Sequence, residues 1–210
     1  VWAPEMEAVV ALRPDAVFLY ANTSKKDCDA IEAQVHQYLP GTEVYRFECF
    51  RPDTYMEEVS KIALVFNRQA EGERFIRFYR SVMDPVAEAV SKMPEEKKVP
   101  VYFESWNDYK SAANGSGYHE KIVLAGGHNL FGTLPNPYPV IDQEDVLKAD
   151  PAVIIKQIGA GETKVGGYTT DDLAPFAEVK QKLLARTGWD QLAAVRDDRV
   201  YVTHSDILGS

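Results

Sequence analysis

Residues 70–93 read AEGERFIRFYRSVMDPVAEAVSKM, and this stretch decides the fold. Its large apolar residues recur every three to four positions, which is typical of one face of a helix. A helix of this length would span about 36 Å, longer than an ordinary connecting helix, although Pro85 can bend it. Pro94 and the charged residues 95–98 end the pattern. We therefore predict one long helix that joins the parts of the chain on either side of it.

The sequence before and after this helix alternates between short apolar runs and helical patterns. Strands are predicted at 16–20, 43–47, 99–103, 152–158 and 199–203. Helices are predicted at 6–12, 27–38, 52–66, 117–125 and 175–186. Such alternation favours parallel sheets with helices packed on them.

This order of elements predicts an α/β protein of two small Rossmann-like lobes, with mainly parallel sheets, joined by one long α-helix. Residues 1–68 would form the N-terminal lobe, residues 69–95 the connecting helix and residues 96–210 the C-terminal lobe. In such sheets, ligands bind outside the carboxyl ends of the strands.

Composition excludes several classes of partner. The chain has 210 residues with a formal net charge of −9 at pH 7, and it has no clustered basic stretch. Because nucleic-acid phosphates need Lys and Arg counter-charges, we expect no nucleic-acid partner. No run approaches the roughly 20 apolar residues that span a bilayer. Any membrane attachment would therefore come from a lipid or N-terminal anchor outside this sequence.

Common catalytic motifs are absent from the sequence. It contains no Gly-x-Ser-x-Gly, no phosphate-binding P-loop and no His-Glu-x-x-His. The four histidines lack the spacing of metal ligands, so no metal site is predicted. Cys28 and Cys49 could form one disulfide or remain two free thiols. These observations favour a binding protein without a cofactor over an enzyme.

Four separated segments carry a resemblance to a known family. They are EAVVALRPD at 7–15, LAGGHNLF at 124–131, VIDQEDVL with DPAVII at 140–155, and GWDQLAAVRDDRVY at 188–201. In this order they resemble motifs of the iron-siderophore and vitamin B12 periplasmic binding proteins, the class III substrate-binding proteins of ABC transporters, whose lobes are joined by a long helix. The resemblance covers nearly the whole chain. It also indicates that about one βαβ portion of the first lobe is missing, so the N-terminal lobe is expected to be partial.

The resemblance implies a function in transport. Members of this family bind a metal chelate between their lobes and deliver it to an ABC permease, which works with its own ATPase. We therefore expect an extracytoplasmic protein, in the periplasm or anchored at the outer cell surface, that binds an iron chelate such as a siderophore. Cobalamin and haem stay open as ligands within the same family. A metal-cluster enzyme of nitrogenase-like fold is the alternative from another class, although such a cluster needs several cysteines.

Candidate ligand-binding residues follow the predicted strands or begin the helix at 117–125. They are Tyr20, Asn22, Phe50, Arg51, Trp106, Tyr118 and His204. Aromatic rings beside an arginine and a few polar groups suit a large, partly apolar chelate. Arg51 could form a bidentate pair of hydrogen bonds with carboxylate or catecholate oxygens. Each aromatic residue could equally pack inside its lobe.

Glu7 and Glu144 match the positions at which the family carries one permease-docking glutamate on each lobe. The resemblance therefore implies that these two acids contact arginines of the permease. Charge pairs of this kind mainly fix register and association rate. Alternatively, both could be ordinary solvent-facing acids near helix N-termini, where carboxylates are favoured for a purely local reason.

Overall fold

The computed structural model describes residues 4–20, 25–159 and 171–208. The chain divides into two compact units. The N-terminal unit comprises residues 1–49 and 54–72, and the C-terminal unit comprises residues 50–53 and 73–210. The predicted treatment of residues 69–95 as a connecting element separate from both lobes stays a prediction.

The N-terminal unit is built around a two-stranded parallel sheet. It contains α1 (Met6–Leu12), β1 (Ala16–Tyr20), α2 (Lys25–Tyr38), β2 (Glu43–Phe47) and α3 (Tyr55–Val65). Ala16 lies opposite Glu43, and Tyr20 lies opposite Phe47. Because side chains alternate along a strand, Phe18 shares a face with Tyr45 and Phe47. Its ring lies 5.5 Å and 6.0 Å from theirs.

The long predicted helix is present as α4 (Gln69–Ser91). Its first residues belong to the N-terminal unit and the remainder to the C-terminal unit. Gly72 lies against Ala63 of α3, where a side chain on Gly72 would collide with the alanine. Glycine at this position therefore permits close packing of α3 on α4. Among the described residues, no helix is both long and apolar enough to span a bilayer.

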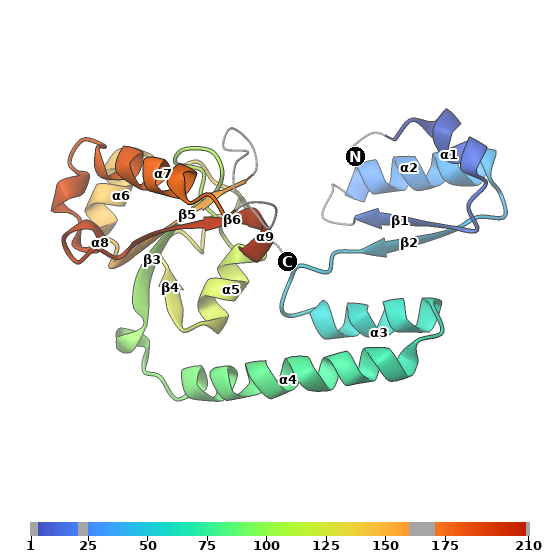
Figure 1. The fold of residues 1–210 in the computed structure, drawn as a ribbon, viewed down its shortest axis with the longest axis horizontal. Coiled ribbons are helices and arrows are strands. Elements are labelled where there is room, and N and C mark those ends of the chain that lie inside the picture. The colour runs from blue at the N-terminus through green and yellow to red at the C-terminus, as the bar shows by residue number, and fades with distance from the viewer. Residues whose placement is uncertain (1–3, 21–24, 160–170, 209–210) are drawn as a thin grey trace. The chain divides into compact units, whose positions relative to one another are not determined.

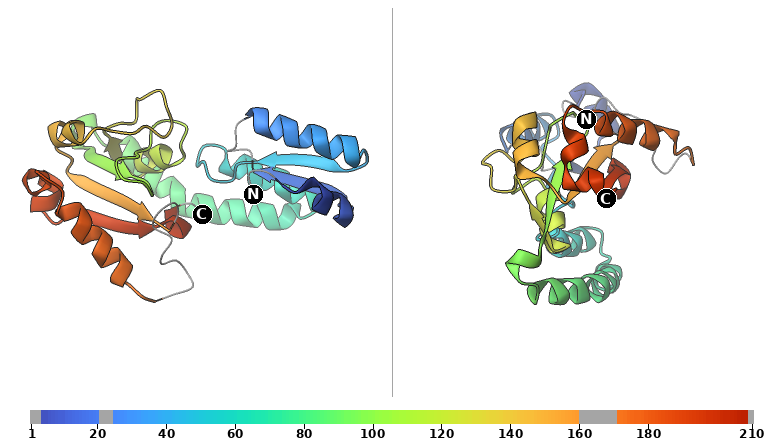
Figure 2. Two further views of the ribbon diagram at one scale, coloured as in Figure 1. Left: turned by 90° about the horizontal axis from the view of Figure 1, so that it is seen from above. Right: turned by 90° about the vertical axis from the view of Figure 1, so that its left-hand side faces the viewer.

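The C-terminal unit contains a four-stranded parallel sheet (Figures 1 and 2). Its strands are β3 (Val99–Glu104), β4 (Gly127–Asn129), β5 (Val153–Ile158) and β6 (Val200–His204), in the spatial order β4-β3-β5-β6. Its helices are α5 (Tyr118–Leu124), α6 (Gln143–Ala149), α7 (Ala174–Leu184), α8 (Ala193–Arg196) and α9 (Ser205–Leu208), with short 3₁₀ turns at Glu95–Lys97 and Trp189–Gln191.

The two faces of this sheet carry separate cores. Tyr102 and Ile154 pack with Trp189 on the face covered by α6 and α7, while Val101 and Phe103 pack with Ile122 on the face covered by α5. Each fully buried large apolar side chain stabilises the fold by about 1.5–3 kcal/mol. The alternation of the two sets along β3 explains why every residue from Val101 to Glu104 is buried.

The predicted fold class is confirmed by this arrangement, with its mixed helices and parallel strands. The short strand β4 and the helices α6, α8 and α9 were not among the predicted elements. Residues 127–129 are Gly-His-Asn, which lack the apolar, β-branched character that signals a strand. Pairing with the first three residues of β3 creates this strand despite its sequence.

Candidate functional site

The carboxyl ends of the C-terminal sheet meet at one edge. There β3 ends at Glu104, β5 ends at Ile158 and β6 ends at His204, while α5 begins at Tyr118. Because α5 follows β3 and leads into the parallel strand β4, its N-terminus lies at this edge as well. Five side chains around this edge, Trp106, Lys110, Tyr118, Tyr138 and Gln157, are called the carboxyl-edge cluster below.

Trp106 and Lys110 occupy the loop after β3. The Lys110 ammonium lies 5.1 Å from the centre of the Trp106 ring and 5.7 Å from that of Tyr138, and the two rings are 6.2 Å apart. Such cation–π contacts are worth about 0.5–1 kcal/mol at exposed sites. In the part of the chain that the structure describes, Lys110 forms no ion pair with a carboxylate. Its positive charge is therefore available to an anion.

The loop that carries these two residues is fixed at both ends. The backbone N–H and the hydroxyl of Ser105 both donate to the carbonyl of Lys110, at 2.7 Å and 2.8 Å. Between them, the Asp108 carboxylate accepts a hydrogen bond from Lys156 at 3.2 Å and lies 2.9 Å from the Arg186 guanidinium. These contacts brace the loop at its two ends and at Asp108.

Tyr118 connects the start of α5 to β5. Its ring stacks on Phe103 with centres 4.8 Å apart, and its hydroxyl accepts a hydrogen bond from Gln157 Nε2 at 2.8 Å. Gln157 is fully buried, and its Oε1 has no hydrogen-bond partner among the described residues. An unpaired buried acceptor is costly, so this atom favours a bound donor or a water molecule.

Phe50 and Tyr138 lie beside the same helix start. A side chain on Gly117 would overlap the Phe50 ring, so the phenylalanine packs directly on the residue that precedes Tyr118. The hydroxyl of Tyr138 donates to the carbonyl of Ser116 at 3.1 Å. The predicted residues Trp106, Tyr118 and Phe50 are therefore brought together through Tyr138 and the 116–118 segment.

His204 lies at the end of β6 but is buried, with 6% of its surface exposed. Its ring packs on Gly159, where any side chain would overlap the imidazole. Its Nδ1 accepts a hydrogen bond from the backbone of Asp206 at 3.1 Å and lies 3.3 Å from that carboxylate. The structure thus gives His204 a packing role at this edge, and its predicted contact with a ligand stays a prediction.

The remaining predicted ligand-binding residues are Arg51, Tyr20 and Asn22. The guanidinium of Arg51 donates from Nε and Nη2 to the Asp53 carboxylate at 3.1 Å and 2.6 Å, so binding another anion would require exchange of this partner. Tyr20 ends β1 of the N-terminal unit and is 51% exposed. Asn22 lies outside the described residues. The roles predicted for Arg51, Tyr20 and Asn22 stay predictions.

Glu7 and Glu144 both occupy the first turn of a helix and are both exposed. Glu7 lies in α1 of the N-terminal unit, and Glu144 lies in α6 of the C-terminal unit, 3.7 Å from Lys148. The positive end of the helix dipole stabilises an acid in such a position. Exposure leaves both carboxylates accessible to a partner.

Metal ligands and cysteines form no cluster in the described part of the chain. No group of three His, Cys, Asp or Glu side chains there could hold a metal ion. Cys28 is buried and Cys49 is half-buried, and both are free thiols. Burial and the neighbouring Glu58 raise the pKa of the Cys49 thiol, which disfavours its thiolate form.

Sequence reasoning missed three members of the cluster, namely Lys110, Tyr138 and Gln157. Lys110 and Tyr138 lie in irregular segments, where no periodicity predicts which side chains meet. Gln157 did carry a signal, because Lys156 and Gln157 interrupt the apolar run of β5 with two polar residues that the structure buries. Buried polar residues inside a strand point to a specific partner.

Comparison with known proteins identifies one matching family and several relatives. A model of the periplasmic binding protein family matches residues 1–207. The Fe(3+)-citrate-binding protein YfmC of Bacillus subtilis is 22% identical over 203 residues, which cover 97% of this chain and 58% of YfmC. The molybdate-binding protein MolA of Haemophilus influenzae is 22% identical over an alignment of 213 positions that covers 94% of this chain and 55% of MolA. This chain thus spans little more than half the length of these relatives.

Solved structures share the fold. The TroA-like periplasmic binding protein FepB from Veillonella parvula superposes with a TM-score of 0.76 at 20% identity, over 96% of this chain and 60% of FepB. At this identity the likeness establishes the architecture and leaves the bound ligand open.

Proposed function

Because the chain belongs to the periplasmic binding protein family, we propose that it is the solute-binding component of an ABC importer that captures an iron chelate. It would hold the chelate at the carboxyl-edge cluster and release it, chemically unchanged, to a permease. We place this activity outside the cytoplasm, as the family description implies.

The observation that carries the choice of ligand is the position of Lys110. Its ammonium lies over the rings of Trp106 and Tyr138, and no carboxylate neutralises it among the described residues. A cation on an aromatic surface suits an anion that also has apolar parts. Ferric chelates of carboxylates or catecholates combine these properties. The name of YfmC, a ferric-citrate-binding protein, agrees with an anionic iron ligand.

The aromatic rings around the helix start would cover the apolar parts of the chelate. Tyr118 is rigidly placed by its stack on Phe103, and Phe50 lies on Gly117 beside it. Placement of this kind lowers the entropy lost when a ligand binds. The unpaired Oε1 of the buried Gln157 would accept a hydrogen bond from the chelate or from a water molecule that the chelate orders.

Glu7 and Glu144 would provide the contacts with the permease. One exposed carboxylate in each unit matches the docking arrangement that the sequence resemblance implies. The permease in turn would couple to its ATPase. Haem and cobalamin are the alternative ligands, and they differ from a ferric chelate in charge and in the size of their flat ring systems.

Tryptophan fluorescence tests the proposal directly. We would titrate the protein with ferric citrate, a ferric catecholate siderophore, haem, cobalamin and free ferric iron. Saturable quenching by a ferric chelate, lost in Trp106→Phe, is the expected result. Trp189 is fully buried in the core and supplies a constant signal.

Removing the positive charge of Lys110 tests its proposed role in binding an anionic chelate. Lys110→Met should weaken binding of an anionic ferric chelate about tenfold, equivalent to about 1.4 kcal/mol, because one ionic contact is lost. Lys92→Met, which removes an exposed lysine just after α4, is the matched control and should leave affinity unchanged. Equal affinities of wild type and Lys110→Met would overturn the assignment. Stronger quenching by haem or cobalamin than by any ferric chelate would identify the alternative ligand class instead.

A further inference from the structure

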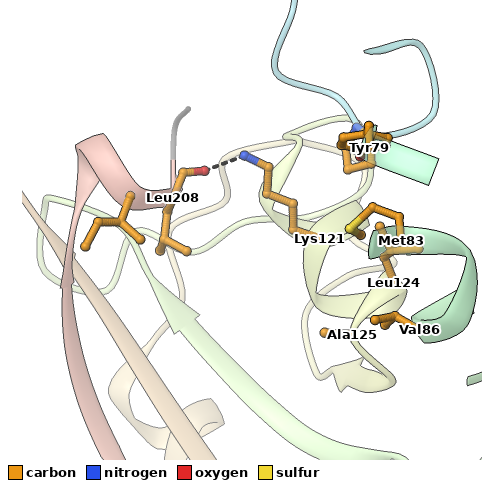
Figure 3. Close-up of a pocket in the computed structure, with 9 residues that line it drawn as sticks. Tyr79, Met83, Val86, Lys121, Leu124, Ala125 and Leu208 are labelled. Atoms are coloured by element: carbon orange, nitrogen blue, oxygen red, sulfur yellow. Dashed lines mark hydrogen bonds between the residues drawn. The ribbon is translucent and has the colours of Figure 1, made fainter. Parts of the chain in front are cut away.

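A separate cavity lies within the C-terminal unit between α4, α5 and α9 (Figure 3). It has a volume of about 250 Å³. Most of its wall is apolar, and the main contributors are Met83, Val86, Leu124, Ala125, Ile207 and Leu208. None of the five residues of the carboxyl-edge cluster lines it. The cavity is therefore a different site from the proposed chelate site.

Lys121 is the one charged residue among those that line this cavity. Figure 3 shows its side chain reaching between Leu208 and the apolar residues of α4 and α5. Its ammonium donates a hydrogen bond to the backbone carbonyl of Leu208. Within residues 4–20, 25–159 and 171–208, no carboxylate pairs with it. A half-buried cation that has only a neutral acceptor retains most of the cost of its lost hydration.

This unbalanced charge also affects the acidity of the lysine. Burial in the apolar wall lowers the pKa of the Lys121 ammonium, and no nearby acid opposes that effect. A neighbouring carboxylate would stabilise the ammonium and reverse the shift. The combination of an apolar wall and one uncompensated cation specifies what would bind favourably here.

We propose that this cavity binds a single-chain amphiphile with one carboxylate head group, such as a medium-chain fatty acid. The carboxylate would pair with Lys121, in exchange for or in addition to the Leu208 carbonyl. The hydrocarbon chain would lie along Met83, Val86 and Leu124. The wall contains one cation and no acid, which suits a ligand with a single negative charge. The apolar side chains on α4 and α5 suit its hydrocarbon chain.

The carboxylate and the hydrocarbon chain make separable contributions, which allows a sharp test. We would measure binding of decanoate, decanol and decyltrimethylammonium by isothermal titration calorimetry. Wild-type protein should bind decanoate about tenfold more tightly than decanol, because a charge-assisted hydrogen bond is stronger than a neutral one. The decyltrimethylammonium cation should bind more weakly than decanol.

Two variants test whether the amphiphile binds in this cavity. Lys121→Met should reduce the affinity for decanoate to that for decanol and leave the affinity for decanol unchanged. Leu124→Trp should fill the cavity and lower the affinity for both ligands. Lys148→Met, which removes an exposed lysine of α6, is the control and should retain the full preference for decanoate.

Three results would overturn the proposal. They are equal affinities of the wild type for decanoate and decanol, a preference for decanoate that survives Lys121→Met, and no binding of any amphiphile by a protein that melts cooperatively. Because none of these ligands contains iron and Lys121 is not in the carboxyl-edge cluster, these outcomes are independent of the proposed chelate binding.

Discussion

The guanidinium of Arg186 forms two hydrogen bonds with the carboxylate of Glu104, from Nη1 at 2.7 Å and from Nη2 at 3.0 Å. Glu104 is fully buried at the end of β3, and Lys156 donates to the same carboxylate at 2.7 Å. The guanidinium also lies 4.4 Å and 4.5 Å from the ring centres of Tyr109 and Trp189. This contact ties the segment after α7 to β3, which leads into the loop that carries Trp106 and Lys110.

Removal of Arg186 should therefore destabilise the protein strongly. Arg186→Met leaves the buried Glu104 with less compensation, and breaking a buried pair in this way costs about 3–5 kcal/mol. The unfolding free energy from urea titration measures the loss. Lys180→Met is the control, because Lys180 pairs with the exposed Asp198, and such a pair contributes at most about 1 kcal/mol. Similar losses in the two variants would contradict the proposed importance of the buried pair.

Asp108 should make a small contribution to stability that disappears in acid. Burial opposes its ionisation, but Arg186 and Lys156 outweigh that effect and hold the pKa of the carboxyl below its ordinary value of 3.8. Because the folded-state pKa is lowered, the contribution is complete above about pH 4 and is lost as the pH falls through the folded value. The side chain is 70% exposed, so we expect on the order of 0.5 kcal/mol.

The pH dependence of Asp108→Asn checks this contribution. Urea unfolding at pH 6 and pH 3 should show a smaller loss of stability for the variant than for the wild type. If both proteins lose the same unfolding free energy over this range, the ion pairs of Asp108 do not contribute.

Gly159 should tolerate no side chain while His204 is present. Its φ is 96°, which side-chain-bearing residues rarely adopt, and a methyl group there would overlap the imidazole. We expect Gly159→Ala to cost roughly 2–4 kcal/mol from strain and steric overlap together. The double variant with His204→Ala should recover the steric part, so a double-mutant cycle should give a coupling of about 1 kcal/mol or more. Purely additive losses would show that the two residues do not press on each other.

Charge reversal should separate docking from ligand capture. Glu7→Arg and Glu144→Arg should each slow association with the permease roughly tenfold, because complementary charges steer the encounter. Chelate affinity should stay unchanged in both variants. Association rates can be compared by surface plasmon resonance on the reconstituted permease, with Glu57→Arg and Glu178→Arg as controls. Unchanged rates for Glu7→Arg and Glu144→Arg would assign the two acids a local role at their helix ends.

Much of the architecture could be predicted because it depends on local patterns. The strands at 16–20 and 43–47 and the long helix are fixed by apolar periodicity, and the structure places them within two residues of the predicted bounds. The resemblance to periplasmic binding proteins is confirmed by the family match, and so is the prediction that the chain is not an enzyme. β4 was not predicted, because its pairing with β3, rather than its own sequence, makes it a strand.

The candidate site could be predicted only in part, because it depends on contacts between distant segments. The positions after the strands drew attention to Trp106, and the start of a predicted helix drew attention to Tyr118. The sequence could not show that Tyr138, 32 positions after Trp106, lies beside it. Nor could it show that Arg51 already pairs with Asp53. Nor could spacing reveal that His204 packs on Gly159.

The ionic cluster of Glu104, Asp108, Lys156 and Arg186, in which Asp108 is the exposed member, has a wider electrostatic consequence. Glu104 and Asp108 carry two negative charges, and Lys156 and Arg186 carry two positive charges, so the group is neutral at pH 7. The net charge of −9 therefore arises from the other residues of the chain. At long range this field would repel an anionic ligand, whereas Lys110 would attract it only at close range. Because salt screens charges beyond about 10 Å at 0.1 M ionic strength, capture of an anion by this chain should become faster as salt is added.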